Sequence, residues 1–322
     1  MSAASLAASS FSKEEPAVHR WWTGQLVGDP PRFVPESGGV LDYGSAYAAK
    51  SGSTMVQTDT RVLFSFSGWI EPTVAPACGR TLLLPRELGV QGSALTIAPS
   101  TEALAALRTG NAVQGSPAAR GSQVEVRVRC SGLSGAVSSG ATGKVGVRTL
   151  ATADGRAFTE VGYDVARQAL YVDHSRCCAS ANAVIQRAPL RATDMPGGGE
   201  LLELVVIVDG GMLETFASQR VAITSLVSPD ERAPGGLEQR RTTFFSEVKG
   251  LECTTTSYKL QLKHARRAAL KADDTAMEGP AAKAERINCS KARATPKRPN
   301  FVLFLQDVKN SEPSRFALCP SR

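Results

Sequence analysis

The sequence predicts an all-β fold built around an antiparallel β-sandwich, and three observations lead to this prediction. Residues 123–129 alternate strictly between valine and polar or charged side chains, which is typical of a strand with one buried face. Asp154-Gly155 and Asp209-Gly210-Gly211 separate apolar runs in the way that hairpin turns do. Short apolar runs recur along the chain with one convincing helix among them, so the pattern favours a sandwich over a βαβ fold.

The chain before the alternating strand consists of short apolar pieces broken by Gly, Pro, Asp and Ser. Such pieces are predicted to be antiparallel strands, and they cover residues 40–47, 61–70, 80–88 and 94–97, with a polar connector over 51–60.

One helix is predicted to begin after Pro99. Ser100 is its expected N-cap, and Glu102 suits the positive end of the helix dipole. Leu104 and Leu107 fall on one face, and Gly110 suits the stop.

Downstream of residue 129, a loop of small residues over 131–143 is followed by a regular series of strands. They are predicted at residues 145–151, 157–163, 170–173, 201–208, 212–216 and 221–227. Ser228-Pro229 ends the series.

The formal net charge of +7 belongs to the C-terminal part of the chain. Residues 1–229 contain 19 basic and 19 acidic residues, whereas residues 230–322 contain 18 and 11. The neutral part gives no reason to expect a nucleic acid as partner. Residues 259–298, rich in Lys, Arg and Ala, are predicted to be a solvated and partly disordered basic segment, with binding of an anionic partner as the alternative.

The cysteines and histidines do not indicate a metal centre. The seven cysteines show no C-x-x-C spacing, so we predict neither a zinc site nor a regular disulfide framework, and we expect free or incidental thiols. The three histidines lie far apart in sequence, and no cofactor is predicted. No apolar run reaches the roughly 20 residues of a membrane helix, and residues 1–12 lack the basic and apolar stretches of a secretory signal, so neither segment is expected.

Several segments, in this order, resemble the last part of glycoside hydrolase family 32, the invertases and other β-fructofuranosidases. They are residues 41–48 and 68–70 (LDYGSAYA and GWI), 84–88 (LPREL), 99–108, 147–163, 171–175, 206–216 and 222–229. The resemblance extends over residues 20–229.

The resemblance implies a domain organisation. Residues 1–19 are expected to be a disordered N-terminus, and residues 20–76 a remnant of a five-bladed β-propeller, corresponding to its last blade. Residues 77–229 would form the C-terminal β-sandwich, and residues 230–322 a basic tail of low order.

The resemblance also implies a chemistry whose catalytic residues are missing here. Family members hydrolyse β-fructosidic bonds in sucrose or fructans with a retaining pair of carboxylates, and retention needs the two groups about 5 Å apart. The nucleophile belongs to a W-x-N-D-P-N-G motif and a sugar-binding Asp to R-D-P, and neither motif occurs in this sequence. Glu252-Cys253 spells the acid/base dipeptide but follows the matching region, so we assign it no catalytic role.

Other residues of the matching segments are interpreted as structural. We expect Asp42, Tyr43, Glu87, Asp173, Asp209 and Glu214 to form turns, strand edges or contacts between propeller and sandwich. Trp69 is expected to pack in the blade or between the domains, and Trp21 and Trp22 to be exposed if the preceding blades are absent.

The sequence therefore predicts a protein of β-fructofuranosidase lineage that does not hydrolyse fructosides by itself. No catalytic, cofactor-binding or metal-binding residues are predicted, and the substrate-binding residues are not assigned. Its expected partner is a fructoside, and a second chain that completes the propeller is a further candidate partner. A non-catalytic β-sandwich module that binds carbohydrate or a partner propeller chain is the alternative.

Overall fold

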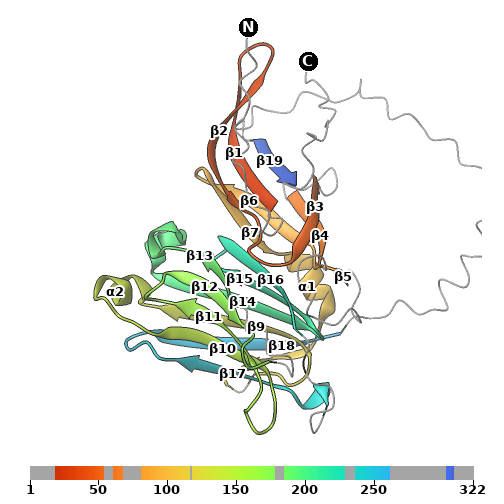
Figure 1. The fold of residues 1–322 in the computed structure, drawn as a ribbon, viewed down its shortest axis with the longest axis vertical. Coiled ribbons are helices and arrows are strands. Elements are labelled where there is room, and N and C mark those ends of the chain that lie inside the picture. The colour runs from red at the N-terminus through yellow and green to blue at the C-terminus, as the bar shows by residue number, and fades with distance from the viewer. Residues whose placement is uncertain are drawn as a thin grey trace, which may run out of the picture.

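The computed structural model describes residues 19–53, 61–67, 81–116, 118–177, 185–227, 229 and 236–261, and the backbone of 302–307. This part of the chain consists almost entirely of antiparallel strands (Figure 1). Two sheets form the predicted β-sandwich, a third sheet from the N-terminal residues packs against one side of it, and a fourth, three-stranded sheet contains the first two strands of the chain. The predicted all-β class is confirmed.

The first sheet of the sandwich has six strands in the order β16-β15-β14-β9-β18-β8. Their bounds are β8 Arg108–Gln114, β9 Gln123–Ser131, β14 Leu201–Asp209, β15 Met212–Ala217, β16 Val221–Leu226 and β18 Glu252–Leu260. The alternating strand predicted from the sequence is β9, and it lies inside this sheet between β14 and β18. Gly210 and Gly211 connect β14 to β15, as the turn signal predicted.

The second sheet of the sandwich has five strands in the order β13-β12-β11-β10-β17. Their bounds are β10 Lys144–Ala151, β11 Thr159–Asp164, β12 Ala169–Asp173, β13 Ile185–Pro189 and β17 Arg241–Ser246. The main apolar core lies between the two sheets and includes Val124, Val126 and Val128, all fully buried.

The sandwich continues beyond residue 229, where the sequence predicted a tail of low order. Strand β17 pairs with β10, and β18 pairs with β9 on one side and β8 on the other. The inward-facing residues of β18 include Thr255 and Ser257, and the Ser257 hydroxyl accepts a hydrogen bond from the Ala119 amide at 2.8 Å. Because these buried side chains are polar, the apolar alternation that marks other strands is missing from β18. The predicted basic segment, residues 259–298, lies outside the described residues from 262 onward.

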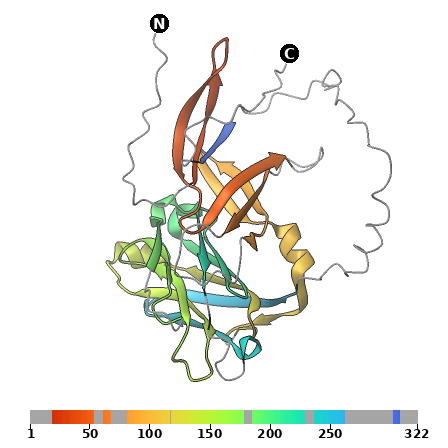
Figure 2. The same ribbon diagram turned by 45° about the vertical axis from the view of Figure 1, so that its right-hand side comes forward.

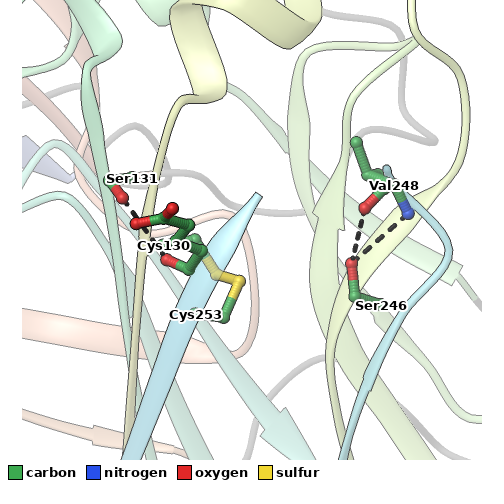
Figure 3. Close-up of a disulfide and its surroundings, with 6 residues drawn as sticks. Cys130, Ser131, Ser246, Val248 and Cys253 are labelled. Atoms are coloured by element: carbon green, nitrogen blue, oxygen red, sulfur yellow. Dashed lines mark hydrogen bonds between the residues drawn. A yellow bond between two sulfur atoms is a disulfide. The ribbon is translucent and has the colours of Figure 1, made fainter. Parts of the chain in front are cut away.

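A disulfide joins Cys130 on β9 to Cys253 on β18, where the two residues are direct cross-strand partners (Figure 3). Cys177 is disulfide-bonded as well. The prediction of free thiols is therefore wrong for these three cysteines. For Cys130 and Cys253 the reason is that pairing across a sheet depends on strand order, which cysteine spacing does not contain.

Two short α-helices accompany the strands in the part of the chain that the structure describes. Helix α1, Thr101–Leu107, is the predicted helix, and the Ser100 hydroxyl caps it by accepting from the Ala103 amide at 3.4 Å. Helix α2, Leu133–Ser138, lies in the segment predicted to be a loop, where the fully buried Leu133 anchors it to the core. Short 3₁₀ turns occur at η1 Ala192–Asp194, η2 Pro196–Gly199 and η3 Leu237–Gln239.

The N-terminal residues form a sheet of β3, β4, β6 and β7, with β5 paired to β4. The bounds are β3 Ala46–Ser53, β4 Arg61–Ser67, β5 Thr81–Leu82, β6 Arg86–Gln91 and β7 Ala94–Pro99. The sequence assigned residues 80–97 to the sandwich domain, but β6 and β7 pair with the earlier strand β4 instead. The predicted boundary at residue 76 thus falls inside one sheet.

A second apolar core joins this sheet to the outer face of the six-stranded sheet. It contains residues from both sides, namely Leu41, Leu63, Leu88, Leu95, Ile97, Leu104, Val205, Ile207, Phe216 and Ala222. The six-stranded sheet is therefore covered on both faces, which explains why β14 and β15 are apolar along most of their length.

A long hairpin of β1, His19–Val27, and β2, Arg32–Val40, projects away from the sandwich (Figure 2). The backbone of β19, Val302–Asp307, adds to its β1 side. Trp21 is partly buried against the second core, and its indole nitrogen donates to the Val40 carbonyl at 3.2 Å. Trp69 lies outside the described residues.

We expect the Cys130→Ala/Cys253→Ala double variant to unfold at lower urea concentration than the parent chain. The cross-link joins residues 123 positions apart, and closing a loop of that size stabilises a fold by about 4 to 5 kcal/mol in the chain-entropy model. Urea unfolding followed by circular dichroism measures the difference in the free energy of unfolding.

The same measurement under reducing conditions supplies the control. Reduction should bring the parent chain close to the double variant, because both then lack the cross-link. A variant as stable as the oxidised parent would show that the disulfide contributes nothing to the fold.

Candidate functional site

The most highly connected polar cluster of the described residues lies between the N-terminal sheet and the sandwich. It consists of Asp42, Arg86, Glu214 and Thr224, which come from four separate stretches of the chain, and we call it the Arg86 network. Sequence reasoning quoted Arg86 within LPREL and Thr224 within the closing strand, but it assigned neither a role.

Strand geometry brings the first of these residues into place. Residues 41–45 run beside β16, where the Tyr43 amide donates to the Ala222 carbonyl at 2.9 Å and the Ser45 amide to the Thr224 carbonyl at 2.8 Å. A Cβ atom on Gly44 would lie 1.8 Å from the Thr224 carbonyl oxygen, so only glycine allows this close approach. The turn is completed by the Gly44 amide, which donates to the Asp42 carboxylate at 2.7 Å.

Arg86 connects the two sides. Its guanidinium donates to Asp42 Oδ2 at 2.7 Å, to Glu214 Oε2 at 2.9 Å and to the Thr224 hydroxyl at 2.6 Å. The same guanidinium lies over the ring of Phe216, with 5.0 Å from its central carbon to the ring centre. The Arg86 side chain has no solvent exposure, so every one of these contacts is made inside the protein.

The carboxylates have further donors. Glu214 Oε1 accepts from the Leu84 amide at 2.9 Å, and Asp42 accepts from both the amide and the hydroxyl of Thr224 at 3.1 and 2.7 Å. Two acids and one base are thus buried together with their hydrogen-bonding groups matched, which is the condition under which buried charges are tolerated.

The electrostatics of the network follow from its burial. Burial raises the pKa of Glu214, and the neighbouring Arg86 guanidinium opposes this rise. For Arg86 itself, burial acts to lower the pKa, but the charges of Asp42 and Glu214 outweigh it and the pKa is raised. The arginine therefore stays charged, and the network is held by ion pairing.

This arrangement is unsuited to acid/base chemistry on a sugar. Asp42 and Glu214 are 4% and 3% exposed, and their oxygens are occupied by Arg86, Thr224 and backbone amides. A glycosidase carboxylate must instead reach the glycosidic oxygen or the anomeric carbon of its substrate. The network accordingly fixes one sheet on another, and its carboxylate oxygens are engaged within it.

A second buried charge lies on the same face of the six-stranded sheet. The Glu125 carboxylate is fully buried and accepts from Arg108 at 2.6 and 2.7 Å and from Arg127 at 2.6 Å. The Arg108 guanidinium also lies over the ring of Tyr258 on β18, 4.1 Å from its centre. The sequence placed Glu125 on the polar face of its strand, and on that face Arg108 and Arg127 pair with it.

Two cavities adjoin the junction. The larger, about 500 Å³, is mainly apolar and is lined by residues 82–85, by α1, by the end of β18 and by β14 and β15, including Glu214. The smaller, about 150 Å³, carries more polar groups, among them Glu87, Arg127, Glu203, Ser218 and Gln219.

The remaining residues singled out from the sequence lie apart from one another. Glu87 accepts from the Thr101 amide at 2.8 Å, Asp173 from the Ser175 amide at 2.8 Å, and Asp209 from the Gln123 side chain at 2.8 Å. Glu252 is exposed on β18, and its neighbour Cys253 is held in the disulfide. The described residues include no cluster of three or more His, Cys, Asp or Glu that could hold a metal ion, and none of their helices could cross a membrane.

Comparison with known proteins assigns the fold to a family. The family described as glycosyl hydrolases family 32 C terminal matches residues 95–263, which is more than half of the chain. The chain belongs to glycosyl hydrolase family 32. The match continues through β17 and β18, in agreement with the sandwich seen in the structure.

A curated relative and several solved structures agree with this assignment. The 6(G)-fructosyltransferase of Asparagus officinalis is 30% identical over 145 residues, which cover 43% of this chain and 23% of the relative. The fructosyltransferase of A. japonicus is 21% identical, with a TM-score of 0.60, and covers 80% of this chain and 52% of its own. Aspergillus kawachii β-fructofuranosidase is 20% identical, with a TM-score of 0.59, 76% coverage of this chain and 52% of its own.

The family 32 chain therefore spans about a quarter of the curated relative and about half of these solved structures. At this level of identity the solved structures show the shared fold.

We expect Arg86→Met to lower the free energy of unfolding by about 3 to 5 kcal/mol, because it leaves two carboxylates buried without their cation. All three tryptophans precede residue 77, and Trp21 and Trp22 lie on β1, so tryptophan fluorescence reports on the N-terminal part of the chain while circular dichroism reports on the whole chain. In the variant the fluorescence transition in urea should precede the circular dichroism transition. Arg191→Met, which removes an exposed ion pair with Asp194, is the control and should leave the stability nearly unchanged.

The loss in free energy of unfolding caused by Arg86→Met should also depend on pH. Without the guanidinium, burial and the Asp42 charge raise the pKa of Glu214 against only the hydrogen bond from the Leu84 amide, so this pKa rises further above the value of about 4.3 that it has in the unfolded chain. The folded variant then binds more protons than its unfolded state, so its stability increases as the pH falls through the raised pKa. Urea unfolding at pH 8 and pH 5 should show a smaller difference between variant and parent at pH 5, and an equal or larger one would contradict this account.

Proposed function

We propose that this chain is the sandwich-bearing part of a β-fructofuranosidase-type protein, and that its substrates by lineage are β-fructosides such as sucrose or fructans. Supporting this, its relatives are named as a fructosyltransferase, a β-fructofuranosidase and an exo-inulinase. The chicory fructan 1-exohydrolase was solved with 1-kestose, a carbohydrate of the same class.

We further propose that the chain hydrolyses no β-fructosidic bond by itself. The observation behind this proposal is the Arg86 network, in which the two neighbouring carboxylates of the junction are buried and bound to one arginine. The motifs N-D-P-N-G and R-D-P are also absent from the sequence. Double displacement needs a nucleophile and an acid/base that both reach the substrate.

The role left to this chain is to support a catalytic propeller. Its N-terminal sheet is fixed on the sandwich by the Arg86 network and by the second apolar core. A propeller that continues from this sheet, in the same polypeptide or in a partner chain, would be held in a constant position relative to the sandwich.

The test is turnover of sucrose and inulin by the purified chain, measured as released fructose beside an active family 32 enzyme. No release above the buffer background is expected. Glu252→Gln and the exposed Glu238→Gln form a matched pair of variants. Turnover that disappears in Glu252→Gln but persists in Glu238→Gln would overturn the proposal, because it would make Glu252 catalytic.

A second test adds the catalytic half of a family 32 enzyme to the purified chain. Restored turnover in the mixture, with none in either part alone, is the expected result if the chain supports a propeller. The Arg86→Met variant should restore less, since its N-terminal sheet is no longer fixed on the sandwich.

A non-catalytic carbohydrate-binding module is the second candidate, and the polar cavity of about 150 Å³ beside Glu87 and Arg127 favours it. Calorimetric titration with fructan oligosaccharides would then show binding without turnover, and Arg127→Gln would weaken that binding. Absence of heat at millimolar oligosaccharide would exclude this candidate.

A further inference from the structure

The hairpin of β1 and β2 has a strand on its far side that comes from the other end of the chain. Residues 302–307 pair with β1 in antiparallel register, from Val302 opposite Gly24 to Asp307 opposite His19. Figures 1 and 2 both show β19 beside β1 and away from the sandwich. The match to family 32 ends at residue 263, so β19 lies outside the matched domain.

The pairing with β19 determines whether the outer backbone groups of β1 are hydrogen-bonded or free. In the order β19-β1-β2, β1 is a central strand, whereas without β19 its backbone donors and acceptors over residues 19–24 would form a free edge. A free edge next to an extended hairpin is a template for pairing with another strand. Residues 302–305, Val-Leu-Phe-Leu, are all apolar, and Val and Phe are among the residues enriched in strands.

The other side of β1 is already fixed. The Thr23 hydroxyl donates to the Ser93 carbonyl, the His19 carbonyl accepts from the Leu41 amide at 2.8 Å, and β2 pairs with residues 20–27 of β1. The β1 edge is therefore held in place independently of β19, so the site would persist when β19 is absent.

We propose that the β1 edge is a strand-binding site, and that residues 302–307 of the same chain occupy it as a displaceable cover. An external extended segment that pairs with β1 would compete with this cover for the same backbone groups. Recognition of this kind rests on main-chain hydrogen bonds, with strand addition as the binding mode. The proposal goes beyond the proposed function and does not depend on catalysis.

The test uses the full chain with Leu303→Pro/Phe304→Pro. Neighbouring residues of a strand direct their amides to opposite sides, so one of the two prolines removes a donor that faces β1 whatever the exact hydrogen-bond pattern. Ala281→Pro/Ala282→Pro, with the same number of prolines outside β19, is the matched control. Hydrogen exchange of peptides covering residues 19–24 is the first readout, with residues 123–131 of β9 as an internal reference.

Exchange over residues 19–24 should be at least about tenfold faster in the β19 variant and unchanged in the control, while β9 is unchanged in both. Equal protection of β1 in the parent and the β19 variant would overturn the proposal, since it would mean that β19 does not cover the edge.

The second readout is binding of a fluorescent peptide with the sequence of residues 300–309. It should bind the β19 variant at least about tenfold more tightly than the parent, because the parent edge is already occupied. Equal binding to both, or binding to neither, would overturn the proposal.

Residues 302–307 that cover β1 could belong to the same chain or to a second copy, and light scattering distinguishes the two cases. Residues 262–301 could extend to roughly 130 Å, so chain length alone permits an exchange between two copies. A monomeric parent is the expected result, and a dimer that dissociates in the β19 variant would overturn the assignment to the same chain. None of these readouts involves fructose release, so their failure leaves the fructoside proposal separately testable.

Discussion

The position of the N-terminal sheet depends on one guanidinium. Arg86 is fully buried between Asp42 and Glu214, and each of these three residues belongs to a different stretch of the chain. The second apolar core supplies contact area, but contact between aliphatic side chains is non-directional. The hydrogen bonds from Arg86 and Thr224 are directional, so they fix which part of the sheet lies over β15 and β16.

A different constraint holds the C-terminal strands of the sandwich. Strand β18 is inserted between β9 and β8, yet the side chains it turns inward include Thr255 and Ser257. The disulfide between Cys130 and Cys253 connects it covalently to β9, and the Ala119 amide satisfies Ser257. Strand β8 pairs with β18 alone among the described strands, so the cross-link also secures the edge of the sheet.

Features that depend on residues close together in the sequence could be predicted from it. The alternation of β9, the glycine turn between β14 and β15 and the Ser100 cap of α1 each follow from local periodicity or turn chemistry, and all three are present. Features that depend on strand order were missed. The Cys130–Cys253 pair, the place of β18 and the assignment of β6 and β7 to the N-terminal sheet require knowing which distant strands are neighbours. The candidate site was predicted only in part. The sequence indicated Asp42 and Glu214 as structural residues that could form turns, strand edges or domain contacts, but no local pattern marked Arg86, which joins them.

The Arg86 network also bears on the chemistry that this family 32 chain can take part in. A raised pKa on a glutamate is often a mark of a general acid, and burial does raise the pKa of Glu214. A general acid must, however, deliver its proton to a substrate oxygen within hydrogen-bond distance. Both oxygens of Glu214 accept from Arg86 or from the Leu84 amide, and the side chain is 4% exposed. Burial explains the raised pKa of Glu214, and the ion pair with Arg86 occupies the carboxylate, so a perturbed carboxyl that would suggest catalysis in an open cleft is here part of a buried network.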